Sequence, residues 1–428
     1  MKHACLIIMA LSLTLLNRCE RNFSVNEPPR QNKLTTSWSA PERSTIQTGN
    51  TFGQNLFALV LKADKNRNVV LSPLSATLAL AMTSNGAAGE TEKAIQDVLG
   101  FSDTPAATIN ATLQHLCDYL VKADTKVGVD IANAIWYRQD KAIEQEFISI
   151  SKSYFNAAVA PMDFGDPKAL LTVNNWVNDN THGRIPSILD QFPPLTVMVL
   201  LNALCFKGTW TYQFDANLTA TQPFYPTPST QISCPMMTQS NTFSYYRDEL
   251  VEAVDLPYAS GAFSMTLILP QTGVSQTATI EWLQSVYLSS WLGRFNKQEG
   301  TIRLPRFKTE YDIVLNDILK SLGMAIAFEG GRADFSRICK GDLYIDMVKQ
   351  KSFIQVDEEG TEAAAATVVV IVERGGGPAG FSMTLNRPFY FLLRETSSNA
   401  LLFVGYIAQP VWRSEERRVG KECRSRGS

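Results

Sequence analysis

The sequence is poor in the features that build metal sites and nucleic-acid interfaces. It has three histidines among 428 residues, and 39 Lys and Arg face 41 Asp and Glu. None of its seven cysteines forms a C-x-x-C pair. Zinc centres and dithiol sites need closely spaced ligands, and nucleic-acid binding needs clustered positive charge. We therefore expect no metal, no cofactor and no nucleic-acid partner. Cys205 lies in an apolar run, which predicts a free, buried thiol.

Motifs of common enzymes are missing as well. The chain contains no G-x-S-x-G nucleophile elbow and no G-x-x-x-x-G-K-[ST] phosphate loop. His182 is a candidate general base, but no nucleophile motif accompanies it. We interpret His182 as a surface or capping histidine, and an ordinary enzyme is disfavoured.

Both ends of the chain look unlike a folded domain. Residues 1–18 carry an early positive charge and then a short apolar stretch, which predicts a secretory signal peptide and a secreted protein. Cys19 directly behind it leaves a bacterial lipoprotein anchor open as an alternative, although the bulky Arg18 disfavours lipobox cleavage. Residues 19–45 are polar and contain proline, which is typical of an exposed tether. Residues 413–428 resemble a translated sequencing-adapter tail, so we exclude them from the fold.

Residues 46–412 contain no linker and no internal repeat, which favours one domain. Apolar spacing and Pro or Gly punctuation predict helices over residues 52–60, 75–85 and 91–99. A further helix is predicted by one apolar face and a stop at Gly323; the face consists of Tyr311, Leu315, Ile318, Leu319 and Leu322. Short runs rich in branched and aromatic residues predict strands over residues 197–206, 262–269, 389–394 and 401–407. This mixture indicates an α+β fold built on a large sheet.

The segment from Asp357 to Pro378 gives conflicting local signals. Glu362 and the alanines 363–366 favour helix, the branched run 368–372 favours strand, and glycines flank both. Composition alone favours a helix, a turn and a core strand. The remainder of the chain indicates a different interpretation.

This segment resembles the hinge and reactive-centre loop of the serpins, the serine protease inhibitor superfamily. The resemblance covers nearly all of residues 46–410 and rests on blocks that follow one another in the family's order. These blocks are residues 68–75, 133–136, 173–177, 181–185, 201–210, 254–258, 304–307, 333–336, 386–389 and 403–405. Each block alone is a weak signal, whereas the ordered set is highly specific.

The resemblance implies one domain with three β-sheets, about nine helices and an exposed reactive-centre loop at about 358–385. A target serine protease cleaves this loop, whose N-terminal half then inserts into the largest sheet and traps the covalent acyl-enzyme. Side chains alternate along a strand, so the side that enters the core has no large or charged group; it carries Thr361, Ala363, Ala365 and Thr367. The implied hinge consists of Glu358, Glu359, Gly360, Thr361, Glu362, Ala363, Ala364, Ala365, Ala366 and Thr367.

Family spacing from Gly360 places the cleaved bond between Arg374 and Gly375. Arg374 would fill a specificity pocket that has an Asp at its base, so the implied partner is a trypsin-like serine protease. Two alternatives stay open. An elastase-like or subtilisin-like protease would use a shifted register, such as Val372–Glu373 or a bond nearer Gly377.

Other positions match parts of the family that control opening of the sheet. Ser72, Ser75 and Asn202 match a polar cluster beneath the sheet, in which Gln350 stands where His is usual. An amide both donates and accepts hydrogen bonds, so we expect Gln350 to alter how readily the sheet opens and not to prevent its opening. Trp210 and Glu358 match positions where the loop first inserts, although a buried Trp is often plain core and an exposed Glu plain surface.

The family also contains non-inhibitory carriers, storage proteins and chaperones, which remain the rival function. Such members are expected to carry bulky, charged or proline residues in the hinge, and residues 361–367 have none beyond the outward Glu362.

The resemblance implies that residues 113–122 correspond to the helix that binds heparin in antithrombin-like serpins. This segment has a single Lys, so heparin activation is not expected. We expect a monomer. Glycosylation is left open at three sequons, Asn22, Asn110 and Asn217.

Overall fold

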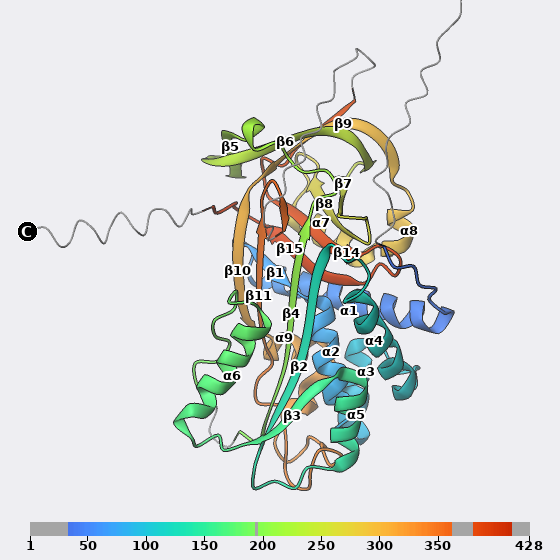
Figure 1. Cartoon of the computed structure of the whole chain (residues 1–428), viewed down its shortest axis with the longest axis vertical. Coiled ribbons are helices and arrows are strands. Elements are labelled where there is room, and N and C mark those ends of the chain that lie inside the picture. Colours follow the sequence, from blue (N-terminus) through green and yellow to red (C-terminus); the bar gives the residue numbers. More distant parts are fainter. Residues whose placement is uncertain (1–32, 193–195, 362–379, 413–428) are drawn as a thin grey trace, which may run out of the picture.

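The computed structural model describes residues 33–192, 196–361 and 380–412 (Figure 1). The first helix, α1, spans Ala40–Ala63. Ser39 caps it in a reciprocal capping box with Glu42, and Pro41 occupies the first turn. Residues 40–45, which were predicted as part of the tether, belong to this helix, and Trp38, which precedes the helix, is buried.

The helices predicted over residues 52–60, 75–85 and 91–99 are all confirmed, the first of them as part of α1. The second helix follows Ser72 as its N-cap, and the third ends at Gly100, whose left-handed φ of 77° suits glycine. The α-helices after α1 are α2 (Pro73–Ser84), α3 (Gly89–Leu99), α4 (Ala106–Leu120), α5 (Gln145–Phe155), α6 (Pro167–Asn180), α7 (Gln276–Ser285), α8 (Leu288–Leu292) and α9 (Asn316–Leu319). No helix in the described ranges is both long and apolar enough to cross a bilayer.

The predicted helix over 311–322 is largely wrong. Tyr311 lies in a strand, and regular α-helix is limited to α9, followed by a wider turn with Gly323 at φ 119°. Tyr311 and Leu315 are both buried, so their spacing of four residues suited either a helix or a strand followed by a turn. The period of two in Phe307, Thr309 and Tyr311 decides for the strand.

The larger of the two sheets has nine strands, and its core strands confirm three of the predicted apolar runs. Their order is β1 (Val69–Leu71), β15 (Leu401–Ile407), β14 (Phe389–Glu395), β8 (Phe263–Pro270), β7 (Val251–Tyr258), β6 (Thr230–Arg247), β9 (Asn296–Pro305) and β13 (Phe381–Thr384), with β5 (Ala220–Thr227) paired to β6. The long β6 pairs with β7 at one end and with β9 along its middle. Hydrogen bonding thus joins two of the three expected sheets into one.

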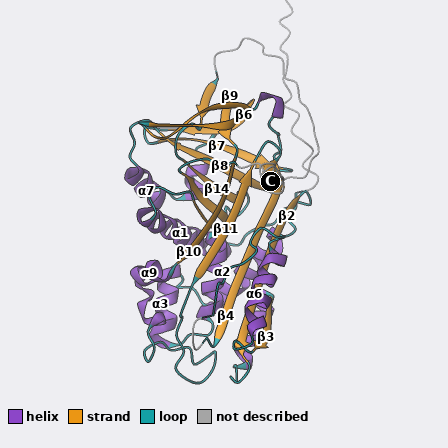
Figure 2. Cartoon of the chain, turned by 90° about the vertical axis from the view of Figure 1, so that its left-hand side faces the viewer, coloured by secondary structure: helices purple, strands orange, loops and turns teal. Residues whose placement is uncertain are grey.

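The smaller sheet is built around two strands of 12 residues each, which run along the length of the molecule (Figure 2). Its order is β10 (Phe307–Val314), β11 (Lys349–Val356), β12 (Gly360–Thr361), β4 (Met198–Thr209), β2 (Val127–Arg138) and β3 (Ala157–Met162). Helix α6 covers one face through Val173 and Val177, which pack near Trp136. Helix α2 contacts both β4 and β15, so it lies between the two sheets. The six-stranded sheet therefore has a helix layer on each face.

Candidate functional site

The site is the gap between β4 and β11 in the six-stranded sheet. At one end of this gap β12 lies between the two strands, with Gly360 opposite Thr209 and Thr361 opposite both Gly208 and Val356. Beyond these two residues, β4 and β11 share no ladder pairing within the ranges that the structure describes. The sheet is therefore divided along most of the length of β11.

Gly360 is required at the start of β12 because two backbones approach closely there. A Cβ on Gly360 would lie 2.1 Å from the carbonyl oxygen of Gly208, and its φ is 155°. Any other residue would push β12 away from β4. The hinge glycine thus permits the chain to turn back into the sheet.

Thr361 points into the core, on the side that strand alternation predicts. Its side chain is 2% exposed, and its hydroxyl shares a 2.6 Å hydrogen bond with the hydroxyl of Tyr258 on β7. Burial raises the pKa of Tyr258 well above its usual range, so the phenol remains protonated. Thr361 therefore links the divided sheet to the nine-stranded sheet.

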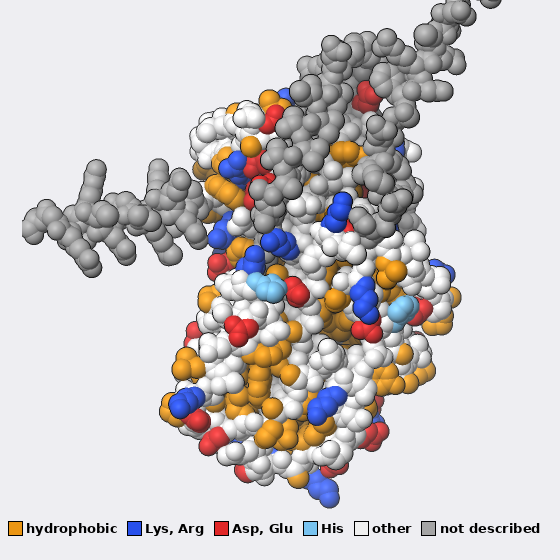
Figure 3. Space-filling model, viewed as in Figure 1, with side chains coloured by type: hydrophobic (Ala, Val, Ile, Leu, Met, Phe, Trp, Pro, Cys, Tyr) orange, Lys and Arg blue, Asp and Glu red, His pale blue; other side chains and the backbone are white. Residues whose placement is uncertain are grey.

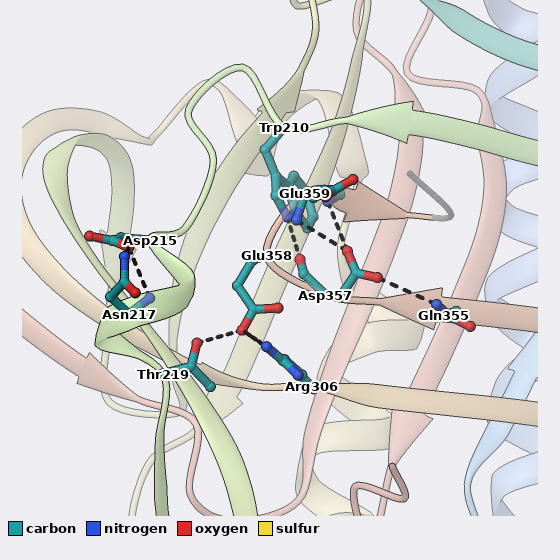
Figure 4. A network of polar contacts seen from close by, with 10 residues as sticks. Trp210, Asp215, Asn217, Thr219, Arg306, Gln355, Asp357, Glu358 and Glu359 are labelled. Carbon is teal, nitrogen blue, oxygen red and sulfur yellow. Dashed lines mark hydrogen bonds and ion pairs between the residues drawn. The ribbon is translucent and has the colours of Figure 1, made fainter. Parts of the chain in front are cut away.

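Glu358 is buried and paired, in contrast to the exposed, solvated Glu that was the plain alternative. Its carboxylate accepts hydrogen bonds from Arg306 Nε at 2.7 Å and from the Thr219 hydroxyl at 2.5 Å (Figure 4). The Glu358 carbonyl also accepts the backbone N–H of Phe214 at 3.0 Å. Buried charges need such partners, so these contacts fix the chain just before β12.

Trp210 holds the turn between β11 and β12. Its indole N–H donates to the Asp357 carbonyl at 3.0 Å, and its backbone N–H donates to the Glu359 carbonyl at 2.8 Å (Figure 4). The Asp357 carboxylate in turn accepts the backbone N–H groups of Glu359 and Gly360. The Trp210 ring stacks on Tyr258 with centroids 4.4 Å apart. These contacts position the first hinge residues at the end of the gap.

Gln350 joins β11 to the start of α2. Its amide donates to the Ser72 carbonyl at 2.9 Å and accepts the Ser72 N–H at 3.1 Å, so it uses both functions of the amide. The Ser72 hydroxyl accepts the N–H of Ser75 and caps α2. The side chain at the position where His is usual in the family is thus fully engaged.

Asn202 lies on the opposite side of the gap. Its Nδ2 donates to Asn133 Oδ1 on β2 at 2.8 Å, and Asn133 donates to the carbonyl of Phe155. Asn202 Oδ1 is buried and accepts no hydrogen bond from the residues that the structure describes. The four matched residues therefore do not form one cluster, since Ser72, Ser75 and Gln350 are connected on one side of the gap and Asn202 pairs with Asn133 on the other.

A cavity of about 470 Å³ occupies the gap below β12. It is lined by β4, β11, α2 and the 340–348 segment, and both Asn202 and Gln350 contribute to its wall. A smaller pocket nearer β12 is lined by Thr361, Phe206 and Ile354 among others. The larger cavity therefore leaves room for a further chain segment in the part of the gap that lies away from β12.

Several predicted residues lie outside the described ranges. They are Glu362, Ala363, Ala364, Ala365, Ala366, Thr367, Arg374, Gly375, the signal segment 1–18, Cys19, Asn22 and the tail 413–428. The chain resumes before β13, where Phe381 stacks on Tyr245 with centroids 3.9 Å apart. Neither this anchor nor the roles of Tyr258, Arg306 and Asp357 was recognised from the sequence. Only Asp357 carried a local signal, since Asp three residues before Gly is typical of a turn.

Other candidate groups have ordinary surroundings. His182 pairs with Asp130 at 2.8 Å, and both side chains are more than half exposed. Cys205 is free and buried. No cluster of metal-ligating side chains occurs in the described part of the chain. The Asn110 amide is buried against Asn85, which leaves no room for a glycan, whereas Asn217 is exposed.

Known proteins resemble the chain over nearly its whole folded part. A family model described as Serpin (serine protease inhibitor) matches residues 47–410. Iripin-3 of Ixodes ricinus is 33% identical over 372 residues, covering 84% of this chain and 93% of that protein. Antithrombin-III of Mus musculus is 32% identical, covering 81% of this chain and 77% of that protein.

Solved structures have the same architecture. The thermophilic serpin tengpin in its native state matches with a TM-score of 0.77 and 31% identity, covering 88% of this chain and 96% of tengpin. Human thyroxine-binding globulin in complex with thyroxine has a TM-score of 0.78 at 24% identity, covering 87% of this chain and 100% of that chain, which is a likeness of fold alone. With the family model, the relatives and the divided sheet in agreement, the chain belongs to the serpin family.

Proposed function

We propose that this chain is a suicide-substrate inhibitor of serine proteases. The protease cleaves the loop, remains attached as an acyl-enzyme, and is trapped when the residues after Thr361 insert between β4 and β11. The place of β12 carries the proposal, since the first two residues of that strand already lie in the gap, antiparallel to both neighbours. The similarity to antithrombin-III supports the same activity class.

The register of β12 gives the position of each further residue in an inserted strand. Thr361 lies opposite Gly208 and Val356. Six residues further along, Thr367 would lie between Asn202 and Gln350 and face the core. A threonine hydroxyl there can donate to Asn202 Oδ1, the buried acceptor that lacks a partner among the described residues. Insertion would therefore satisfy this acceptor.

Insertion also supplies the reach and free energy that trapping needs. The steps from Gly360 to Arg374 span roughly 46 Å at about 3.3 Å per residue, which is about the width of a domain. On the order of ten new ladder bonds at about 1 kcal/mol each contribute about 10 kcal/mol. This surplus is available to distort the active site of the attached protease.

The proposed target is a trypsin-like protease that cleaves between Arg374 and Gly375. The test is to mix the protein with trypsin, separate the products on a denaturing gel and map the cut bond by mass spectrometry. We expect a band at the summed mass of both proteins that survives boiling, since an ester withstands denaturation. Clean cleavage without this band would identify a non-inhibitory member and contradict the proposal. Trapping at Val372–Glu373 would indicate an elastase-like target.

Exchange of Arg374 tests specificity separately from the mechanism. Arg374→Ala should lose about 2–4 kcal/mol of interaction in the protease pocket, and with it most inhibition of trypsin. Arg374→Lys keeps the positive charge and is the matched control. Association rates measured by progress curves give the result, and unchanged inhibition by Arg374→Ala would show that another bond is used.

The site of action follows from residues 1–18. We infer that they direct secretion, which agrees with an extracellular protease target. A lipid anchor at Cys19 is the alternative. Mass spectrometry of the mature N-terminus distinguishes the two, since a diacylated Cys19 adds the mass of its lipid.

A further inference from the structure

The cavity between β4 and β11 has the chemical character of a ligand pocket. Its volume of about 470 Å³ lies within the range of roughly 300–1,000 Å³ that holds small molecules. Apolar side chains from several elements line it, including Leu80 of α2, Leu201 of β4 and Ile338. Gln350 and Asn202 lie on the side of the cavity toward β12, with Lys351 next to Gln350, and Arg138 lies at the opposite end of the strands.

The charges that line the cavity favour an anion. Five are cationic and two are anionic, namely Arg138, Lys141, Lys340, Lys349, Lys351, Asp342 and Asp346. Three of the cations are engaged, since Arg138 pairs with Asp140, Lys349 with Asp312, and Lys351 donates to the Ser187 carbonyl.

Lys141 and Lys340 differ from the other three cations. Within the described ranges neither ammonium group has an ion pair or a side-chain hydrogen bond. Their segments are neighbours, because the Glu144 N–H donates to the Ile338 carbonyl at 2.8 Å. In Figure 3, hydrophobic side chains gather over the lower half of the visible face, with a few cations among them. The notable chemical combination in the described part of the chain is thus an apolar cavity whose lining includes two unpaired lysines, the half-buried Lys141 and the exposed Lys340.

We propose that this cavity binds a long-chain fatty carboxylate, with the acyl chain in the slot and the carboxylate on Lys141 and Lys340. A neutral lipid would leave both ammonium groups to water alone, and a small polar anion would leave the apolar lining unfilled. The occupant would lie where the loop strand inserts. The regulatory consequence rests on the proposed function: a bound fatty acid slows insertion and shifts the protein from inhibitor to substrate.

Binding is tested with the full-length protein and oleate below its micellar concentration, by equilibrium dialysis. Oleate should bind at one site per chain, and oleyl alcohol, which lacks the charge, should bind at least about tenfold more weakly. The double variant Lys141→Gln/Lys340→Gln should show a similar loss. The double variant Lys93→Gln/Lys152→Gln alters two exposed lysines outside the cavity and should bind as the wild type does. Equal binding by the cavity variant, or equal binding of the alcohol, overturns the proposal.

The regulatory part has its own measurement. Oleate should raise the number of inhibitor molecules consumed per trypsin molecule, and this rise should be absent in Lys141→Gln/Lys340→Gln. Without oleate the two proteins should consume the same number. If no covalent complex forms even without oleate, the proposed function fails while dialysis still decides on binding. If complexes form but oleate does not bind, only this inference fails.

Discussion

In the nine-stranded sheet, β14 and β15 are buried at every residue and pair with their neighbours along their length. In the six-stranded sheet, β4 and β11 are connected, among the residues that the structure describes, only through the two residues of β12. The centre of the first sheet is filled by rings such as Phe391, whereas the hydrogen-bonded amides of Gln350 and Asn202 stand among the apolar side chains that flank the gap of the second.

This difference indicates how one chain provides both a fixed frame and a sheet that admits a strand. A sheet held by buried apolar side chains has no low-energy open state, because opening exposes that surface to water. Polar side chains such as Gln350 and Asn202 keep their own hydrogen bonds while the strands are apart. Tyr258 connects the two parts, since it belongs to the closed sheet and bonds to Thr361 at the mouth of the gap.

The largest expected effect comes from blocking the mouth of the gap. Thr361→Arg would bury an unpaired cation beside Tyr258, at a cost of several kcal/mol, and slow insertion by roughly a hundredfold or more. Trypsin should cut the variant at the same bond and then be released in active form. A denaturing gel should therefore show little covalent complex. Thr361→Ser keeps the hydroxyl and is the control. Trapping by Thr361→Arg equal to the wild type would rule out insertion at β12.

A cavity in the closed sheet should reduce stability and leave trapping intact. Phe391 is fully buried and its ring lies over Gly405, so Phe391→Ala should cost about 3–5 kcal/mol. Calorimetry should show similar losses in melting temperature for intact and loop-cleaved protein. Leu171→Ala removes an exposed side chain and should change little. A large loss of trapping by folded Phe391→Ala would contradict the separation of roles between the sheets.

A smaller effect is expected at the polar side of the gap. Gln350→Leu would leave the N–H of Ser72 without a partner and its C=O with the Ala76 N–H alone, which costs about 1–3 kcal/mol. Hydrogen exchange should accelerate in β10 and β11, while amides of β14 and β15 stay protected. Unchanged exchange throughout would show that Gln350 does not control opening.

The smallest effect tests the register of the inserted strand. Thr367→Val preserves volume and removes the hydroxyl that would reach Asn202, so the loop-cleaved form should lose about 0.5–1.5 kcal/mol. The intact form should be unaffected. Ala366→Ser, on the outward side by alternation, serves as the control. An equal loss in both forms would mean that Thr367 does not meet Asn202 on insertion.

The sequence predicted the apolar strands well, because runs such as 389–394 and 401–407 are short and bounded by Pro or Asn. Both faces of these strands are buried, so an unbroken apolar run is enough to identify them. It predicted α2 from Pro73 and the stop of α3 from Gly100. The start of α1 was missed although Ser39 and Glu42 form a readable capping box, since the surrounding polar residues suggested a tether.

The site was predicted less completely, because its partners come from distant parts of the chain. Family resemblance indicated Gln350 and Asn202, but only the structure assigns them to opposite sides of the gap with different partners. The error at Tyr311 has a similar cause, since two buried residues four positions apart do not reveal whether a strand such as β11 lies beside them. Long-range pairing, which local periodicity cannot encode, determines both.

The central claim is that the gap between β4 and β11 accepts the loop as a strand. The most direct measurement is the melting temperature of the wild-type protein before and after a single cut in the loop, with the cut verified by mass spectrometry. About ten new ladder bonds should raise the melting temperature of the cut form by at least about 10 °C. A cut protein that melts at or below the temperature of the intact form would contradict strand insertion.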